Sequence, residues 1–113
     1  MKEIAQRVES QIRSMDTAAR FGGDELAILL PETSAIEAAK LAERIRECIS
    51  AQPVALTGEI ERTLTVSVGV AALSPGRHES DLKAVADRLI ADADAALYRA
   101  KALGRNRVQV GAG

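Results

Sequence analysis

Two adjacent glycines, Gly22 and Gly23, lie between two segments that each have the length of a β-strand. The segment that follows them contains the apolar run Leu-Ala-Ile-Leu-Leu and is stopped by Pro31. Glycine accepts the positive φ angles of tight hairpin turns, so this arrangement predicts a β-hairpin with strands at residues 17–21 and 25–30. We therefore expect the fold to include this antiparallel pair.

Apolar residues recur at helical spacing in three other segments, which predicts three helices. The first covers residues 2–15. The second opens at a capping box formed by Ser34 and Glu37, and the third covers residues 81–103, where Gly104 is placed to end it. The expected inner positions are Ile4, Val8, Ile12 and Met15 in the first helix, Ala38, Leu41, Ile45 and Ile49 in the second, and Leu82, Val85, Leu89, Ala93, Ala96 and Ala100 in the third.

Two further strands are predicted near the C-terminal end. Apolar residues alternate with polar or small ones at residues 64–70, and a short strand is expected at residues 106–110. Residues 53–62 are polar and contain Gly58, which suits a loop or a minor hairpin. The predicted order is helix, strand, strand, helix, strand, helix, strand, so the fold class is α+β.

The composition restricts the classes of function. The chain has 113 residues, enough for one small domain, and its formal net charge of -1 argues against a basic surface that holds DNA or RNA. A single cysteine, Cys48, excludes an internal disulfide, and no Cys/His cluster has the spacing of a zinc site. No apolar run is long enough to cross a bilayer, so we expect no membrane contact and a cytoplasmic location.

The predicted hairpin turn carries residues that can handle phosphate. Two glycines let a phosphate approach the main chain closely, because they have no Cβ atom. The carboxylates of Asp24 and Glu25 beside them suit a hard divalent cation such as Mg²⁺. The alternative is a plain hairpin turn with a solvated acidic pair, and these four residues alone leave both interpretations open.

A second candidate site lies at the predicted end of the last helix. Lys101 and Arg105 are four residues apart and lie on the same side of that end. Arginine can hold a phosphate through its planar fork and lysine as a point charge. The alternative is that the two cations only complement the negative end of the helix dipole.

Together these segments resemble a known family. The run Arg-Phe-Gly-Gly-Asp-Glu-Leu at residues 20–26 is similar to the signature of the GGDEF domain of bacterial diguanylate cyclases, with Leu26 in place of the final Phe. Residues 96–106 resemble that family's closing helix and its Lys-x-x-x-Arg element, and residues 65–70 resemble the strand between them. The resemblance extends over residues 2–110, with the motifs in the family's order and spacing.

The resemblance implies a ferredoxin-like, nucleotide-cyclase-like α/β sandwich that performs nucleotidyl transfer. Two GTP molecules, one on each domain of a homodimer, condense to cyclic di-GMP and release pyrophosphate, with Mg²⁺ as cofactor. By this analogy Asp24 and Glu25 are catalytic, with Asp24 as the metal ligand and Glu25 supporting the metal or the attacking hydroxyl. The residues implied to bind the GTP phosphates are Gly22, Gly23, Lys101 and Arg105.

The resemblance also implies an inhibitory site. Arg13 and Asp16 match an Arg-x-x-Asp element that binds cyclic di-GMP in the family and blocks productive pairing of domains, and Arg44 falls where a second arginine is expected. Arginine can hydrogen-bond the Hoogsteen edge of guanine in bidentate fashion, and aspartate can accept from its N–H groups. The alternative is an ion pair at a helix end that stabilises the fold by under about 1 kcal/mol.

The chain departs from the family in lacking the first central strand, with its metal-binding Asp, and the following helix, with the Asn and Asp that recognise guanine. We therefore expect residues 1–113 to be a partial, N-terminally truncated GGDEF domain that is not active alone. The missing strand would lie between the hairpin and residues 64–70. Both neighbours would then expose unpaired backbone groups unless another copy completes the sheet, by swapping or by another assembly.

Three functions stay open at this point. The first is a diguanylate cyclase domain in second-messenger signalling, whose activity belongs to the intact protein. The second is a catalytically silent module that binds cyclic di-GMP through Arg13, Asp16 and Arg44, and the third is a structural remnant that only dimerises. Incubation with GTP and Mg²⁺ tests the first, and titration with cyclic di-GMP, repeated with Arg13→Ala, separates the other two.

Overall fold

The computed structural model describes residues 2–22, 25–58, 60–73 and 82–111. Its elements follow the predicted order, and residues 53–62 form the minor hairpin rather than a loop. The elements are α1 (Lys2–Glu9), β1 (Thr17–Arg20), β2 (Leu26–Leu29), α2 (Ala35–Ala51), β3 (Val54–Thr57), β4 (Ile60–Arg62), β5 (Val68–Val70), α3 (Leu82–Ala102) and β6 (Val108–Val110). The predicted α+β class is thus confirmed.

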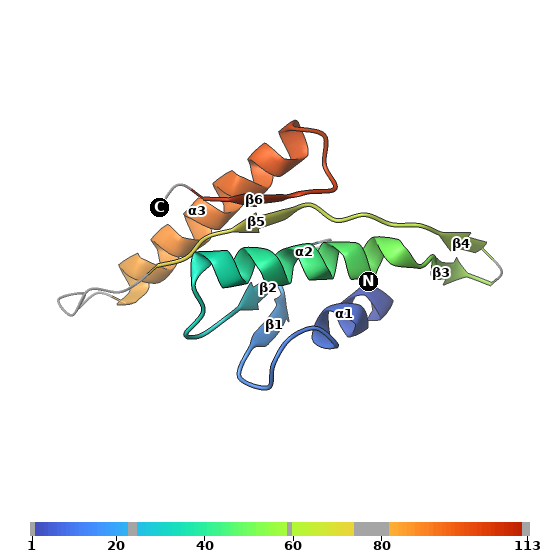
Figure 1. The fold of residues 1–113 in the computed structure, drawn as a ribbon, viewed down its shortest axis with the longest axis horizontal. Coiled ribbons are helices and arrows are strands. Elements are labelled where there is room, and N and C mark those ends of the chain that lie inside the picture. The colour runs from blue at the N-terminus through green and yellow to red at the C-terminus, as the bar shows by residue number, and fades with distance from the viewer. Residues whose placement is uncertain (1, 23–24, 59, 74–81, 112–113) are drawn as a thin grey trace.

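The long helix α2 lies at the centre of the molecule. In Figure 1 it separates α1 and the β1–β2 hairpin, on one side, from β5, β6 and α3 on the other. Its start follows from the predicted cap, because the Glu37 N–H donates to Ser34 Oγ at 3.1 Å. The Ser34 hydroxyl also donates to the Glu37 carboxylate at 3.3 Å, so both residues of the predicted capping box take part.

Burial of apolar side chains on two faces of α2 explains this central position, since removing apolar area from water is the main force that holds a fold together. One cluster joins α2 to α1 and to the hairpin; its buried members are Val8, Leu41, Ile45 and Ile49, and Ile4, Ile12, Ala18, Leu26, Ile28, Leu30, Leu64 and Val66 pack against it. The other cluster joins α2 to β5 and β6; its buried members are Ala38, Ala42 and Val70, with Leu30, Val68 and Val108 packed against it.

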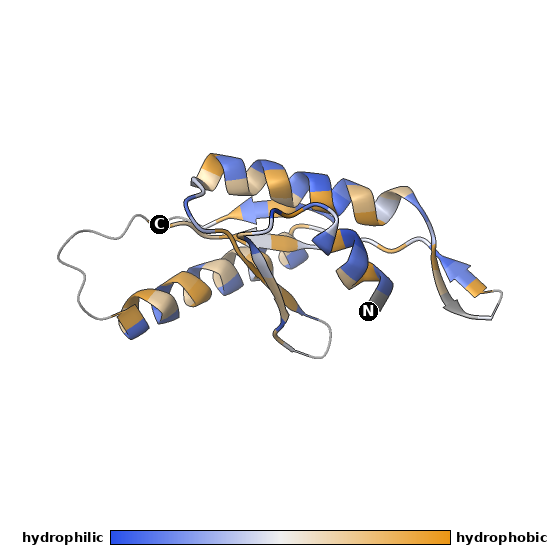
Figure 2. Ribbon diagram, turned by 90° about the horizontal axis from the view of Figure 1, so that it is seen from below, coloured by the Kyte–Doolittle hydropathy of each residue, from blue (hydrophilic) through white to orange (hydrophobic). Residues whose placement is uncertain are grey.

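Strands β5 and β6 form a parallel pair between two helices. Figure 2 shows α2 and α3 on opposite faces of this pair, and both helices contact both strands. Helix α3 comes very close to β5 at Gly69. A Cβ atom at this position would lie 2.2 Å from Ala93 O and 2.4 Å from Leu97 N, so only glycine allows the two backbones to approach in this way.

The described strands pair as three separate two-stranded sheets. Strands β1 and β2 are antiparallel with Arg20 opposite Leu26, which confirms the predicted hairpin; β3 and β4 are also antiparallel. Among the described residues, β2 pairs with β1 and β5 with β6, and no ladder joins the two pairs. The expectation that a missing strand belongs between the hairpin and the 64–70 segment stays a prediction.

The first helix is shorter than predicted. It ends at Glu9 rather than at residue 15, and the Ser10 hydroxyl donates to the carbonyl oxygen of Arg7 at 2.6 Å. A serine side chain that bonds a carbonyl of the last turn competes with continuation of the helix. Ile12 still packs against the core from outside the helix, whereas Met15 is 44% exposed and is not a core residue.

Two strand boundaries and one predicted core residue also differ from the prediction. The strand expected at residues 64–70 is assigned only to Val68–Val70, where β6 supplies a partner. The last strand begins at Val108 rather than at 106, because Asn106 has a left-handed φ of 47°. Leu82, expected on the inner face of α3, is 73% exposed at the first residue of that helix.

Candidate functional site

The turn between β1 and β2 is the first predicted site, and the structure describes its two flanks. The N–H groups of Phe21 and Gly22 both donate to the carbonyl oxygen of Glu25, at 2.9 and 3.3 Å. The backbone of Glu25 therefore closes the predicted hairpin. Gly23 and Asp24 lie outside the described residues, so the assignment of Asp24 as a metal ligand stays a prediction.

The surroundings of Gly22 show whether the fold itself requires a glycine there. A Cβ atom at this position would meet the Glu25 side chain at 3.7 Å or more, which is an ordinary van der Waals contact. Phe21 beside it is 57% exposed, so this flank of the turn faces solvent. A requirement for glycine at position 22 would have to come from a ligand that approaches the backbone.

Glu25 is half-buried and offers one carboxylate of the kind that Mg²⁺ prefers. Within the described ranges, no three His, Cys, Asp or Glu side chains are grouped so that they could hold a metal ion. The described residues therefore do not form a Mg²⁺ site by themselves. The donor type fits the cation, and the predicted site depends on Asp24.

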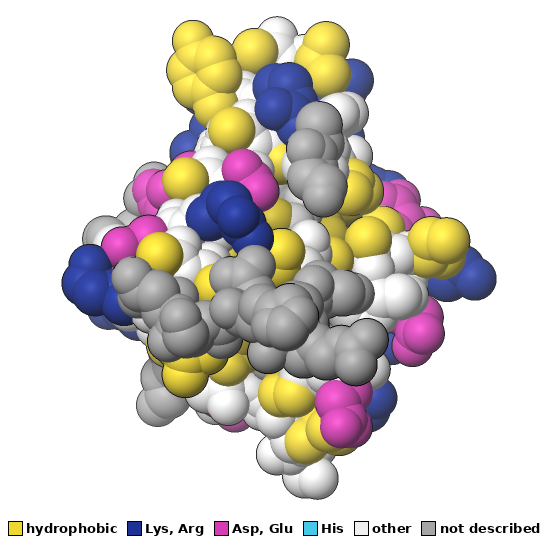
Figure 3. All heavy atoms as spheres, turned by 90° about the vertical axis from the view of Figure 1, so that its left-hand side faces the viewer, with side chains coloured by type: hydrophobic (Ala, Val, Ile, Leu, Met, Phe, Trp, Pro, Cys, Tyr) yellow, Lys and Arg dark blue, Asp and Glu magenta, His cyan; other side chains and the backbone are white. Residues whose placement is uncertain are grey.

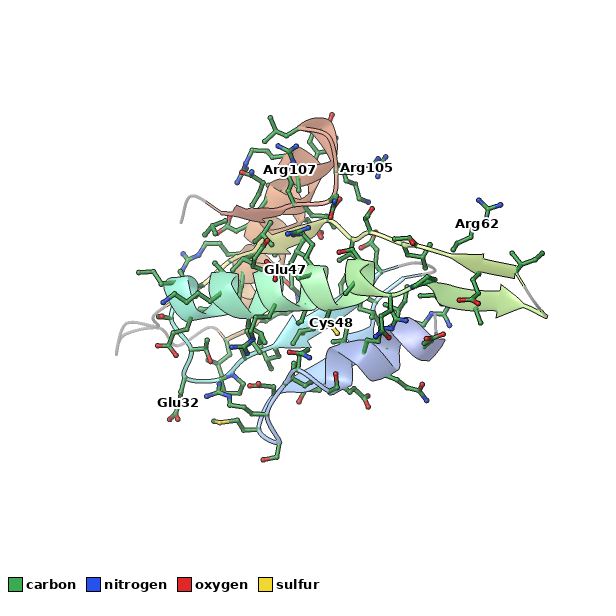
Figure 4. The ribbon with its side chains drawn as sticks, turned by 45° about the vertical axis from the view of Figure 1, so that its right-hand side comes forward. Glu32, Glu47, Cys48, Arg62, Arg105 and Arg107 are labelled. Carbon is green, nitrogen blue, oxygen red and sulfur yellow. The ribbon has the colours of Figure 1, made fainter. Side chains whose placement is uncertain are left out.

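The turn after α3 is the second predicted site, and Gly104 ends the helix as predicted. Gly104, at a φ of 122°, donates its N–H to Lys101 O at 3.4 Å, and the Arg105 N–H donates to Ala100 O at 2.9 Å. This pair of hydrogen bonds is the Schellman arrangement, which satisfies the last carbonyls of a helix. Lys101 and Arg105 are both exposed at this turn. Figure 4 shows Arg105 and Arg107 near this turn, and Arg62 beside β4.

An arginine of α2 reaches this turn, and the sequence did not predict the contact. Arg46 Nη1 donates to Asn106 Oδ1 at 2.9 Å, and Arg46 Nε donates to both carboxylate oxygens of Glu43, at 3.1 and 3.0 Å. These hydrogen bonds hold the pKa of Glu43 below its ordinary value. The spacing of Glu43 and Arg46 on one helix would have suggested an ion pair, but no local pattern links Arg46 to a residue 60 positions away.

The predicted inhibitory site contains the ion pair that the sequence analysis gave as the alternative. The Arg13 N–H donates to Asp16 Oδ2 at 2.9 Å, and the Arg13 guanidinium lies 3.3 Å from both carboxylate oxygens. The backbone hydrogen bond is the main reason why the pKa of Asp16 is lowered. Thr33, which the sequence analysis missed, accepts from Arg13 Nη2 at 2.8 Å.

This ion pair does not block a ligand from reaching the arginine. The Asp16 side chain is 1% exposed, whereas the Arg13 side chain is 55% exposed. Arg44 on α2 is exposed as well. Convergence of these three residues on one ligand stays a prediction, as does convergence of the hairpin turn and the turn after α3 on one triphosphate.

The surface of the molecule matches a near-neutral chain. Figure 3 shows the end where α2 begins; basic, acidic and hydrophobic side chains are interspersed on this face rather than gathered by charge. Among the helices that the structure describes, none has both the length and the apolar character needed to cross a membrane.

Comparison with known proteins shows the family. Residues 1–107 match the family described as "Diguanylate cyclase, GGDEF domain". YhcK of Bacillus subtilis (strain 168) is 44% identical over 110 residues, which cover 96% of this chain and 28% of YhcK. The response regulator PleD of Caulobacter vibrioides is 36% identical over 109 residues, which cover 96% of this chain and 23% of PleD. The chain thus spans only a minor part of the length of these relatives.

Solved GGDEF domains have the same fold. The GGDEF domain of DgcB from Caulobacter crescentus, solved in complex with c-di-GMP, gives a TM-score of 0.80 at 31% identity over 95% of this chain and 60% of that one. The active GGEEF domain of a diguanylate cyclase from Vibrio cholerae also gives 0.80 at 31% identity, over 99% of this chain and 66% of that one. The sequence match over residues 1–107 and the shared fold show that this chain belongs to the GGDEF family of diguanylate cyclase domains.

Proposed function

We propose that this chain handles GTP as part of a diguanylate cyclase and that the 113-residue chain is not active alone. The observation that carries the proposal is the turn between β1 and β2. It carries the family's signature run, and its described flank faces solvent at a glycine that the fold does not require. Gly22 leaves the backbone uncovered although a Cβ atom would fit there, and an uncovered backbone lets a phosphate approach closely.

The phosphate-binding roles follow from charge and placement. Lys101 and Arg105 are exposed at the end of α3 and in the turn after it, where their cationic groups can hold the terminal phosphates of GTP. Gly22 and Gly23 lie along the phosphate chain. Asp24 binds Mg²⁺ and Glu25 supports the same site; Mg²⁺, when bound, reduces the charge repulsion between the phosphates and the attacking oxygen.

Two copies are needed for the reaction, because each copy supplies one GTP. The 3′-oxygen of each GTP attacks the α-phosphorus of the other, each attack forms one P–O bond, and each breaks the bond to the leaving pyrophosphate. The two hydroxyl protons are lost to bases, and cyclic di-GMP and two pyrophosphates result. Positioning and charge stabilisation dominate such a transfer, and the glycines, carboxylates and cations of the two turns are what this chain contributes to both. We place this chemistry in the cytoplasm.

Calorimetric titration of the chain with GTP and Mg²⁺ tests the nucleotide assignment. We expect weak but measurable binding that Lys101→Ala and Arg105→Ala each reduce by about tenfold, because a cation in contact with phosphate is worth roughly 1–3 kcal/mol. Arg62→Ala, which removes an arginine of β4 that the proposal does not assign to GTP, is the matched control and should bind like the wild type. If Lys101→Ala and Arg105→Ala both bound GTP as tightly as the wild type, the assignment would be contradicted. We expect no cyclic di-GMP from the isolated chain.

A second candidate function is binding of cyclic di-GMP at Arg13, Asp16 and Arg44. The observation that favours it is the exposure of Arg13: Asp16 and Thr33 hold its guanidinium, yet its side chain is 55% exposed. The GGDEF domain of DgcB is solved in complex with c-di-GMP, which adds a relative that binds this ligand. Titration with cyclic di-GMP should give binding that Arg13→Ala removes.

A further inference from the structure

The turn after α3 holds two residues other than glycine in the left-handed region. Arg105 has a φ of 61° and Asn106 a φ of 47°. L-residues rarely adopt this conformation, and asparagine tolerates it better than arginine does. Such a conformation persists only where the surroundings fix it, and it is concentrated at sites that bind ligands.

Side-chain hydrogen bonds contact both residues, one from within the turn and one from α2. The carbonyl oxygen of Arg105 accepts from Arg107 Nε at 3.2 Å. The side-chain oxygen of Asn106 accepts from Arg46 of α2 at 2.9 Å, across 60 positions of the chain. Arg46 is itself held, because its side chain is only 18% exposed and its Nε lies 3.1 and 3.0 Å from the two oxygens of Glu43.

We propose that Arg46, oriented by Glu43, is a positioning residue for the phosphate site. Through its hydrogen bond to Asn106 it holds the left-handed turn in the conformation that presents Arg105 to a nucleotide phosphate. Arg46 does not touch the nucleotide; its guanidinium is already engaged by Glu43 and Asn106. The inference rests on the proposed function, in which Arg105 holds a terminal phosphate of GTP.

The test is calorimetric titration of the 113-residue chain and its variants with GTP and Mg²⁺. Arg46→Ala should bind about fivefold more weakly, as expected for loss of one charge-assisted hydrogen bond at a part-exposed position. Asn106→Gly should weaken binding by a similar factor, because glycine keeps the left-handed φ but removes the acceptor. The variant that combines Arg46→Ala with Asn106→Gly should bind GTP no more weakly than whichever single variant binds it more weakly.

The Asn106→Gly variant separates positioning from simple attraction. It leaves the net charge unchanged, so an Arg46 that acts only as a nearby positive charge would leave Asn106→Gly at wild-type affinity. That result would overturn the proposal. Losses that simply add in the double variant would overturn it as well, since two residues that act through one hydrogen bond cannot lose it twice.

Glu43 and Glu47 offer a matched pair of carboxylates on the same helix. Glu47 lies 4.0 Å from Arg46 Nη2 and its side chain is 66% exposed, so it contributes little to the orientation of the guanidinium. Glu43→Ala and Glu47→Ala remove the same charge, yet only Glu43→Ala should weaken binding, by about twofold to threefold. Equal affinities of the two variants would contradict the role of Glu43.

Arg105→Ala distinguishes failure of this inference from failure of the proposed function. If Arg105→Ala binds GTP as tightly as the wild type, or the wild type does not bind, both ideas are overturned. If Arg105→Ala weakens binding by about tenfold while Arg46→Ala and Asn106→Gly bind like the wild type, only the positioning role is overturned. Far-UV circular dichroism of each variant confirms that the compared chains are folded.

Discussion

Replacing Gly69 by alanine tests the close packing of α3 on β5. The added Cβ would lie 2.2 Å from Ala93 O and 2.4 Å from Leu97 N. An unstrained carbon–oxygen contact needs about 3.3 Å, so helix and strand would have to separate by about 1 Å. The obstacles are backbone atoms in the middle of α3, and no side-chain rotation can relieve them.

The expected cost follows from this rigidity. Overpacking a well-packed interior costs about 1–3 kcal/mol, and contacts with helix backbone place this variant at the upper end of that range. Separation of α3 would also loosen the packing around Ala96 and Ala100, which are 0% exposed. We therefore expect Gly69→Ala to lower the free energy of unfolding by about 3 kcal/mol.

Urea unfolding followed by circular dichroism at 222 nm measures this loss. The matched control is Gly22→Ala, where an added Cβ makes only ordinary contacts at 3.7 Å or more, and which should change the free energy of unfolding by less than about 0.5 kcal/mol. If Gly69→Ala were as stable as this control, the close approach of α3 to β5 would be wrong, and so would the argument from it.

Three further predictions concern other parts of the molecule. Arg7 donates to three carbonyl oxygens at the end of α2 and beyond it, at 2.8–3.0 Å. Arg7→Leu should therefore lower the free energy of unfolding by about 2 kcal/mol in urea titrations. A loss below about 0.5 kcal/mol would contradict this helix-capping role. Because the pKa of Asp16 is lowered in the folded chain, its contribution to stability is present above about pH 4 and is lost as the pH falls through that lowered pKa. The Asp16→Asn variant should therefore lose less stability than the wild type on acidification. Parallel curves of the free energy of unfolding against pH for the two chains would refute this linkage. Gly22→Ala should keep its stability yet bind GTP at least about tenfold more weakly in calorimetric titrations, and unchanged binding would argue against phosphate contact at this turn.

The sequence predicted well those elements whose structure is decided by residues close together in the chain. The cap at Ser34 depends on a residue three positions away, and the hairpin depends on two glycines between two apolar segments. The Schellman end at Gly104 likewise depends on the last turn of α3 and the residue that follows. In each case the residues that decide the structure are neighbours in the chain.

The predictions that failed depend on distant partners or on competing local bonds. Alternation at residues 64–70 indicated the right face for Leu64 and Val66, but a ladder forms only at Val68–Val70, where β6 lies alongside. The helical spacing of apolar residues up to Met15 predicted a helix to residue 15. The helix ends at Glu9 instead, because the Ser10 hydroxyl bonds a carbonyl of its last turn.

The candidate site divides in the same way. The glycines, carboxylates and cations of the two turns are visible as residue types in the sequence, and those types suffice to suggest phosphate and metal binding. The Arg46–Asn106 hydrogen bond joins α2 to the turn after α3 and exists only because both pack on the β5–β6 pair. Supporting contacts of this kind carry no sequence pattern, because the packing of the whole chain creates them.

We propose that the β1–β2 turn and the turn after α3 bind one and the same triphosphate. Paramagnetic broadening tests it directly: Mn²⁺, in place of Mg²⁺, is added with GTP to the ¹⁵N-labelled chain, and its amide signals are followed. If one triphosphate contacts both turns, the amide signals of Gly22 and Arg105 should broaden together, at the same concentration of Mn²⁺–GTP, and Mn²⁺ without GTP should leave Arg105 sharp. Broadening of one turn while the other stays sharp at saturation would contradict it.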